Sequence, residues 1–171
     1  MLRIGHGFDV HAFAEGRALI LGGVRIDAPK GLLGHSDADV VTHALMDALL
    51  GAMRAKDIGQ LFPDTDPAYA GADSCELLAR VAGLARDRGY LILDCDCTIA
   101  AQAPRLAPHC EAMRKNLAHA MGVPMTSVGV SATTTEHLGF VGREEGIAAC
   151  NCSKERWKFF VYDFGSCYNE V

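Results

Sequence analysis

The sequence predicts a single domain of the α+β class, and three observations support this. Its 171 residues are enough for one hydrophobic core but few for two. Segments rich in β-branched or alternating apolar residues are separated by segments in which apolar residues recur at helical spacing. Every apolar run ends well before the roughly 20 residues that a membrane-spanning helix needs. The expected strands cover residues 2–5, 19–26, 91–101 and 127–133.

The first expected helix follows Ser36 and Asp39, which are spaced as a capping box with Asp39 in place of the usual glutamate. Asp39, His43 and Asp47 follow one another at every fourth position, so we expect them to form a polar stripe that presents His43. A second stripe is apolar and is expected to pack on a sheet. It consists of Val41, Ala44, Leu45, Ala48, Leu49 and Ala52.

Two further helices are expected. The second runs from about Asp73, which forms another capping pattern with Glu76, to a natural stop at Gly89. The third begins near Pro108 and ends at Gly122. Their expected core faces are Leu77, Leu78, Val81, Leu84 and Ala85 in the second helix, and Met113, Leu117, Ala120 and Met121 in the third.

Charge and composition exclude several classes of partner. The net charge is −5 and the basic residues are scattered, whereas nucleic-acid binding needs a concentrated basic surface. We therefore expect no nucleic-acid partner and no membrane partner. A strand-like segment begins at residue 2 without a signal-peptide pattern, so a cytoplasmic location is expected.

The cysteines do not form a disulfide framework, because their number is odd and no C-x-x-C pair occurs. Two C-x-C pairs leave two interpretations open, a metal site or free thiols in or near the core. The seven cysteines are Cys75, Cys95, Cys97, Cys110, Cys150, Cys152 and Cys167.

The stretch GFDVHAF contains a candidate metal site. In an extended strand Asp9 and His11 point to the same face, as metal ligands or as a hydrogen-bonded pair at a turn. His43 could supply a third ligand, since two imidazoles and one carboxylate leave an open position on zinc, as in catalytic sites. Asp47 could hold the second imidazole nitrogen of His43, or it could be a solvated aspartate of a helix face.

Two other segments are candidates for phosphate chemistry. The run SATTTEHLGFVGREEG offers hydroxyls, backbone N–H groups and the carboxylate of Glu136, which resembles a phosphate-and-magnesium site. It is equally explained as a strand that ends in β-branched residues. Residues 56–74 have the Pro, Gly and Asp content of a loop and are longer than a simple connection requires, which is typical of functional loops.

Five motifs in unbroken order between residue 2 and about residue 149 carry a family resemblance: GFDVHAF, GLLGHSDADVVTHALMDALLGA, KDIGQLFPDTDPAYAGADS, TIAAQAPRLAPH and SATTTEHLGFVGREEGIA. Together they resemble the 2-C-methyl-D-erythritol 2,4-cyclodiphosphate synthase family. The resemblance implies a small mixed or antiparallel sheet packed on one side by about three helices. It also implies a homotrimer around the sheets, with active sites between subunits.

The implied reaction belongs to isoprenoid biosynthesis by the non-mevalonate pathway. It converts 4-diphosphocytidyl-2-C-methyl-D-erythritol 2-phosphate to 2-C-methyl-D-erythritol 2,4-cyclodiphosphate and CMP, the chemistry of a phosphorus–oxygen lyase. The resemblance implies an intramolecular phosphoryl transfer in which the 2-phosphate attacks the β-phosphorus, assisted by divalent metals. Such a transfer asks mainly for alignment and for cations that neutralise charge.

The resemblance also implies a role for individual residues. Zinc would be held by Asp9, His11 and His43, and magnesium or manganese by Glu136 and the substrate diphosphate. His35 and Thr134 would stabilise the transition state, with His35 just before a helix N-terminus that favours phosphate. The implied substrate-binding residues are Asp9, His11, His35, Ser36, Asp57, Gly59, Phe62, Asp64, Asp66, Ala101, Gln102, Ala103, Pro104, Arg105, Leu106, Ala107, Thr133, Thr134, Thr135, Glu136, Phe140 and Arg143.

Within this set, the loop with Asp57 to Asp66 would close over the methylerythritol part. The residues from Ala101 to Ala107, with Thr133 to Glu136, would form a cytidine pocket supplied by the adjoining subunit. Phe140 and Arg143 would line a cavity on the trimer axis that can hold an isoprenoid diphosphate.

Departures from the family pattern are concentrated at the C-terminus. Ser131 occupies a position where the family often has lysine. From Cys150 the chain reads CNCSKERWKFFVYDFGSCYNEV in place of an apolar closing strand. We therefore divide the chain into a synthase domain at residues 1–149 and an atypical segment at 150–171, which is either a divergent last strand or a tail.

Two rival functions remain open at this stage. One is a zinc-dependent phosphoesterase in which the metal activates water, which would need no cytidine. The other is a metal-stabilised trimer that binds a diphosphate without turnover.

Overall fold

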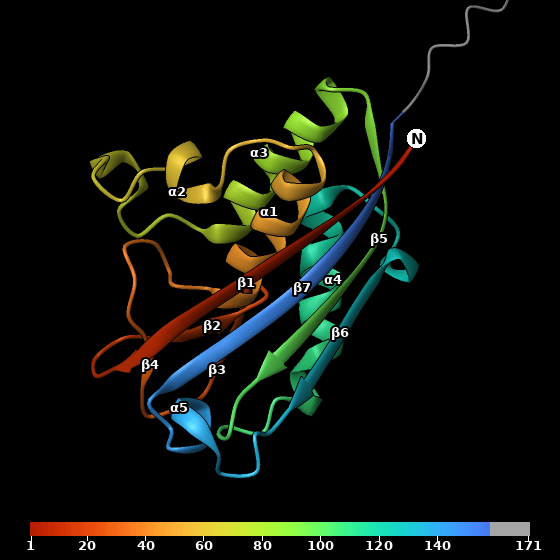
Figure 1. Ribbon diagram of the computed structural model, residues 1–171. Helices are drawn as coiled ribbons and strands as arrows, with labels where there is room; N and C mark the ends of the chain where they lie inside the picture. The colour runs from red at the N-terminus through yellow and green to blue at the C-terminus, as the bar shows by residue number, and fades with distance from the viewer. Residues whose placement is uncertain (158–171) are drawn as a thin grey trace, which may run out of the picture.

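A five-stranded sheet forms the centre of the computed structural model, which describes residues 1–157 (Figure 1). Its strand order is β4-β1-β7-β5-β6, and only the β5–β6 pair is parallel. A separate hairpin contains β2 and β3. The strands are β1 (Leu2–Ala14), β2 (Leu19–Leu21), β3 (Val24–Ile26), β4 (Gly31–Leu32), β5 (Tyr90–Ala100), β6 (Val128–Thr133) and β7 (Gly146–Trp157).

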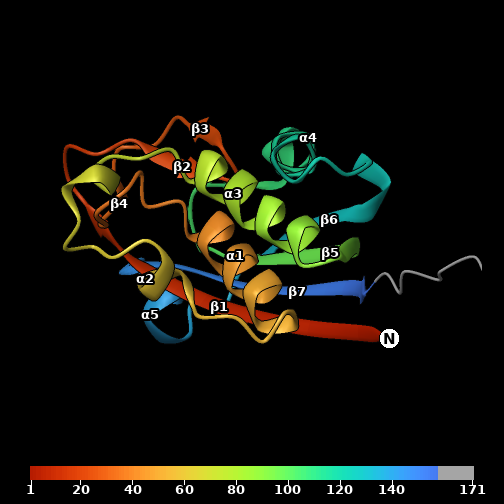
Figure 2. The ribbon, with the colours of Figure 1, turned by 90° about the horizontal axis from the view of Figure 1, so that it is seen from above.

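The three long helices cover one side of this sheet, so the predicted α+β class and its one-sided packing are confirmed (Figure 2). No helix within residues 1–157 combines the length and apolar character needed to cross a membrane. The helices are α1 (Val40–Ala52), α2 (Ile58–Leu61), α3 (Ser74–Asp87), α4 (Cys110–Met121) and α5 (Gly139–Gly142), with 3-10 turns η1 (Pro67–Tyr69), η2 (Ala107–His109) and η3 (Met125–Ser127).

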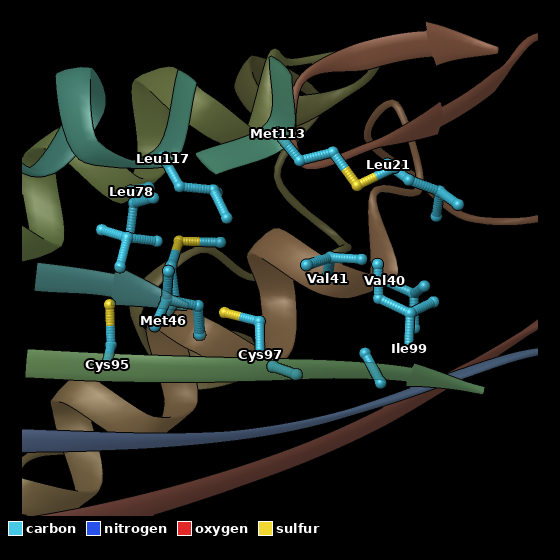
Figure 3. Close-up of a cluster of buried hydrophobic side chains, with 14 of the residues drawn as sticks. Leu21, Val40, Val41, Met46, Leu78, Cys95, Cys97, Ile99, Met113 and Leu117 are labelled. Atoms are coloured by element: carbon cyan, nitrogen blue, oxygen red, sulfur yellow. The ribbon is translucent and has the colours of Figure 1, made fainter. Parts of the chain in front are cut away.

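The core lies between the helices and the sheet. Figure 3 shows Cys95 and Cys97 pointing from β5 toward the side chains of α1, α3 and α4. Burial raises the pKa of the Cys95 thiol to about 12, so this thiol stays protonated at neutral pH. The cysteines within residues 1–157 are free thiols: Cys95 and Cys97 are buried, whereas Cys150 and Cys152 of the second C-x-C pair are exposed, and Cys167 lies outside the described residues.

Several element boundaries differ from the sequence prediction. The first strand continues to Ala14 instead of ending at residue 5, and the segment 19–26 is divided into two strands by a turn at Gly22 and Gly23, both with positive φ. Such a two-residue turn follows the twist of a hairpin, which explains the division. Residues 56–74 are not a plain loop, since they contain α2 and η1.

The predicted capping box at Ser36 and Asp39 is wrong, because Asp39 itself is the N-cap and α1 begins at Val40. Its carboxylate accepts hydrogen bonds from the backbone N–H groups of Val41 and Thr42 and from the Thr42 hydroxyl. It also accepts from the N–H groups of Gly22 and Gly23. Asp39 is fully buried, so it does not belong to the exposed polar stripe that the spacing predicted.

The strand β7 extends into the segment that departs from the family pattern. Residues 150–157 continue the ladder with β1 and β5, while residues 158–171, which hold most of the predicted divergent strand or tail, lie outside the described residues. The inward positions of this part are polar and buried: Asn151, Ser153 and Glu155. The Asn151 amide donates to the backbone oxygen of Val41, but neither carboxylate oxygen of Glu155 has a hydrogen-bond partner.

The other side of the sheet exposes an apolar stripe on β1. Side chains alternate along a strand, so even-numbered residues of β1 point away from the helices. The stripe consists of Leu2, Ile4, Phe8 and Val10, which are 57%, 71%, 59% and 44% exposed.

Glycines on the opposite face of β1 allow α1 to lie directly against the strand. A Cβ atom on Gly7 would overlap the backbone oxygen of Ala44, and one on Gly5 would overlap that of Ala48. This contact fixes the position of α1 relative to β1.

We predict that Gly7→Ala destabilises the protein by at least about 1–3 kcal/mol, because α1 must move away from β1 to accommodate the methyl group. Urea unfolding measures this loss. Gly51→Ala in the same helix is the matched control, since a Cβ there would meet its nearest atom only at 3.8 Å. The control should be neutral or stabilising by up to about 1 kcal/mol; equal effects of the two substitutions would contradict the prediction.

A second prediction concerns Glu155, whose burial raises its pKa from 4.5 to about 7. Its contribution to stability is complete below pH 4.5, where it is protonated in both states, and is lost as the pH rises through 7. The loss is at most about 3 kcal/mol. Glu155→Gln should therefore raise the free energy of unfolding at pH 8 but change it little at pH 4.5.

Unfolding curves at the two pH values measure this difference. Glu144→Gln, at an exposed glutamate, is the control and should show no such dependence. If the free energy of unfolding of Glu155→Gln depends on pH in the same way as that of the unsubstituted protein, the prediction is wrong and Glu155 is ionised in the folded protein.

Candidate metal centre and adjoining pockets

Asp9, His11 and His43 are brought together by the contact between β1 and α1. Asp9 and His11 lie two residues apart on the inward face of β1, and His43 lies in the first turn of α1. Asp9 Oδ2 is 3.0 Å from His11 Nε2 and 3.3 Å from His43 Nδ1, and the two nitrogen atoms are 3.1 Å apart. Among residues 1–157 this is the one group of three or more such side chains arranged to hold a metal ion.

The backbone fixes the tautomer of His11. Its Nδ1 lies 2.7 Å from the carbonyl oxygen of Leu33, which can only accept a hydrogen bond. Nδ1 therefore carries the proton in the neutral ring, and the lone pair of Nε2 points toward Asp9 and His43. This is the arrangement that metal-binding histidines adopt.

The second nitrogen of His43 has different partners from those that the sequence suggested. Nε2 lies 2.9 Å from the hydroxyl of Ser74 and 3.1 Å from that of Ser36. Asp47 does not contact it; the Asp47 carboxylate accepts from the backbone N–H of Ile58. The sequence hypothesis that Asp47 orients His43 is therefore wrong, because Asp47 orients the start of α2 instead.

The donor set fits a divalent metal ion. Ligand atoms about 2 Å from a tetrahedral ion such as zinc lie about 3.3 Å from one another, and the three atoms here are 3.0 to 3.3 Å apart. Burial alone would raise the pKa of Asp9, but its contacts with His11 and His43 outweigh burial and lower it. Burial would lower the pKa of His11, but Asp9 outweighs burial and raises it. The carboxylate is thus held in the charged form that binds a cation.

A pocket of about 240 Å³ adjoins this centre. Its lining joins β1, the segment before α1, α1 itself, the α2–η1 segment and α3. Most of the sequence-predicted residues of these elements are present: Asp9, His11, His35, Ser36, His43, Gly59, Phe62 and Asp64. The remaining lining residues were not predicted: Gly34, Met46, Ile58, Tyr69 and Leu77.

Two residues predicted for this region do not line the pocket. Asp57 caps α2 by accepting from the Gln60 N–H, and the backbone oxygen of Asp66 lies 3.4 Å from His35 Nε2. The rings of Tyr69 and Phe62 pack edge to face, with their centroids 5.3 Å apart. Ile58 and Tyr69 are apolar residues in a segment rich in Asp and Pro, and this contrast is the feature of the sequence that could have identified them as pocket-lining residues.

A second pocket of about 390 Å³ is formed where β5 and β6 end. The backbone N–H of Ala101 donates to the oxygen of Thr133, which joins the two segments. The pocket brings together ten residues, nine of them predicted: Ala101, Gln102, Ala103, Pro104, Arg105, Leu106, Ala107, Ala132, Thr133 and Thr134. No residue lines both pockets, so within one chain the metal centre and this second pocket are separate.

The carboxylate of Glu136 lies beside the second pocket. Its Oε1 accepts a hydrogen bond of 2.7 Å from the Thr134 hydroxyl, while the Thr135 hydroxyl donates to the backbone oxygen of Leu138. Phe140 lies on α5 and is 39% exposed. Arg143 follows α5 and pairs with Glu145 at 2.8 Å.

The predicted use of a helix N-terminus by His35 is not supported. The helix begins three residues later than the capping box implied, and the Asp39 carboxylate already accepts from the N–H groups of Val41 and Thr42 in its first turn. A phosphate near His35 would therefore depend on side chains and loop backbone.

Comparison with known proteins identifies a family and close relatives of this chain. The model of the YgbB family matches residues 2–153. The 2-C-methyl-D-erythritol 2,4-cyclodiphosphate synthase of Geobacillus thermodenitrificans is 60% identical over 149 residues, 87% of this chain and 93% of the relative. The synthase of the same name from Thioalkalivibrio sulfidiphilus is 62% identical over 148 residues, 86% of this chain and 92% of the relative.

A solved structure is similar as well. The CDP complex of IspF from Plasmodium falciparum aligns with a TM-score of 0.80 and 30% identity, over 92% of this chain and 97% of that chain.

Proposed function

Since this chain belongs to the YgbB family, we propose that it converts 4-diphosphocytidyl-2-C-methyl-D-erythritol 2-phosphate to 2-C-methyl-D-erythritol 2,4-cyclodiphosphate and CMP. The enzyme is then a phosphorus–oxygen lyase of non-mevalonate isoprenoid biosynthesis. Its cytoplasmic location stays a prediction from the sequence.

One observation carries the proposal: three metal-binding atoms of Asp9, His11 and His43 converge at the edge of a pocket. We infer that these residues hold zinc. Held by these residues, the ion would supply Lewis-acid chemistry at the β-phosphate, worth several kcal/mol of transition-state stabilisation. Three protein ligands would leave a tetrahedral ion able to take a substrate oxygen as well.

The chain's own residues align the reacting groups. His35 and Ser36 lie in the same pocket as the metal centre and bind the 2-phosphate. Phe62 and Asp64 border it from the α2–η1 segment and enclose the methylerythritol part. Alignment of the two phosphates in this way makes the transfer intramolecular, so no covalent intermediate on the protein is required.

The second pocket holds the cytidine. Backbone groups between Ala101 and Ala107 bind the base edge, and Thr134, together with His35, stabilises the transition state. Glu136 supplies a hard carboxylate ligand for magnesium or manganese on the diphosphate. The complex of the Plasmodium falciparum relative with CDP supports a nucleotide ligand for this fold.

A homotrimer joins the two pockets in this proposal, with the metal centre of one subunit facing the cytidine pocket of the next. Two observations support it: one chain keeps the pockets separate, and β1 exposes the apolar stripe Leu2, Ile4, Phe8 and Val10. Exposed apolar patches of this kind mark contact surfaces. Phe140 and Arg143 then line the axial cavity and bind an isoprenoid diphosphate.

Phosphorus NMR of the purified protein with the proposed substrate, zinc and magnesium tests the reaction. We expect signals of CMP and a cyclic diphosphate. His43→Ala should lower the rate at least about 100-fold, because it removes a ligand of the ion that stabilises the transition state. His119→Ala, at an exposed histidine of α4, is the control and should retain activity.

Other products would contradict the proposal in distinct ways. Release of inorganic phosphate without a cyclic product would indicate a phosphoesterase. Binding of substrate without turnover would indicate a binding protein.

The location of the site between subunits is tested by mixing two inactive variants. His43→Ala damages only the metal half, and Glu136→Gln only the nucleotide half. If neighbouring subunits complete each site, random mixed trimers should regain about one quarter of full activity. In an equal mixture half of the subunits carry an intact metal half and half carry an intact nucleotide half, so about one quarter of the sites combine the two. A mixture as inactive as its components would show that each chain carries a complete site.

A further inference from the structure

Ser74 and Asp37 form a hydrogen-bonded chain that ends on His43. The Ser74 hydroxyl donates to Asp37 Oδ1, and the backbone N–H of Ser74 donates to Asp37 Oδ2 at 3.0 Å. On its other side the same hydroxyl oxygen lies 2.9 Å from His43 Nε2. Ser74 is fully buried at the first position of α3, so this arrangement is sheltered from water.

The direction of these bonds determines which nitrogen of His43 carries the proton. A carboxylate only accepts, so the single hydrogen of the Ser74 hydroxyl points to Asp37. Toward His43 the hydroxyl oxygen can then only accept, which requires a proton on Nε2. The lone pair of Nδ1 is thereby directed to Asp9 and His11.

Ser36 cannot make the same selection. Its hydroxyl lies 3.1 Å from Nε2 and accepts from the backbone N–H of Ala38, but no carboxylate holds its hydrogen. It can donate to Nε2 or accept from it, so it is compatible with both tautomers.

We propose that Ser74 and Asp37 are positioning residues that hold His43 in its metal-binding tautomer. This inference rests on the proposed function in that it takes Asp9, His11 and His43 as metal ligands. It adds two residues that belong neither to the ligand group nor to the lining of the adjoining pocket. Residues in such positions are worth about 10- to 100-fold in metal affinity.

The test compares Ser74→Ala with Asp73→Ala. Asp73 is the N-cap of α3 and accepts from the Cys75 N–H, so its substitution perturbs the same helix end without touching His43. Zinc affinity is measured by competition with a chromophoric chelator. The His43 tautomer is read from long-range proton–nitrogen NMR spectra of the metal-free protein with labelled histidine.

We expect Ser74→Ala to weaken zinc binding about 10- to 100-fold and to introduce the Nδ1–H tautomer of His43, while Asp73→Ala changes neither. Unchanged affinity in Ser74→Ala would overturn the proposal. So would a loss of affinity with an unchanged tautomer, because it would indicate a merely structural role. Asp37→Ala keeps the Ser74 hydroxyl but removes the oxygen that accepts from it, and it decides the question by the same two measurements if Ser74→Ala does not fold.

The outcome is distinguishable from failure of the proposed function. An intact chain that binds zinc but forms no cyclic product would contradict the synthase reaction, and the effect of Ser74→Ala on affinity and tautomer would still be decisive. An intact chain without zinc affinity would overturn the positioning role.

Discussion

The direct contact of α1 with β1 is the constraint on which the metal centre depends. Asp9 and His11 are fixed by the ladder between β1 and β7, in which they pair with Ala149 and Ile147. His43 belongs to a different element, so its distance from them is set by how closely the helix approaches the strand. Any side chain at Gly7 would meet the backbone of α1 and increase that distance. A site with ligands 3.0 to 3.3 Å apart tolerates little such displacement.

Asp39 provides the second constraint, since it determines where α1 begins. A buried carboxylate is costly unless its hydrogen-bonding capacity is satisfied, and burial indeed raises the pKa of Asp39. Here N–H groups from the first turn of α1 and from the β2–β3 turn, with one hydroxyl, satisfy it. The residue therefore joins the hairpin to the helix and fixes the rotation that directs His43 toward β1.

Local patterns in the sequence predicted the parts of the fold that have strong periodicity. The helices α3 and α4 and the strands β5 and β6 lie within a few residues of their predicted ranges. The sequence predicts no strand at residues 146–149, and it leaves residues 150–171 as a divergent last strand or a tail because they do not match an apolar closing strand. The strand state of β7 depends on pairing with β1 and β5 on its two sides, which no local pattern reports.

The candidate site shows the same division. Asp9 and His11 follow from the two-residue period of a strand, and His43 from its position on the first predicted helix. Ser74 and Asp37 could not be predicted, because their contacts join residues separated by 31 and 37 positions in the chain. The sequence suggested Asp47 in their place, since it is one helical turn from His43, but it contacts Ile58. Spacing identifies neighbours within an element, whereas the partners of a metal ligand here come from another element.

The buried polar residues on the inner face of β7 differ in how well their hydrogen-bonding groups are satisfied. Asn151 pairs with Gly7 and Cys97 in the ladder, and its amide bonds to Val41 at the start of α1, so its burial is partly compensated near the metal centre. Glu155 pairs with Arg3 in the ladder, but its carboxylate oxygens have no hydrogen-bond partner. It lies six residues beyond Ala149, which at the rise of a strand is about 20 Å from the position opposite Asp9. The uncompensated burial thus falls at the far end of the sheet, where it lowers stability without disturbing the geometry of Asp9, His11 and His43.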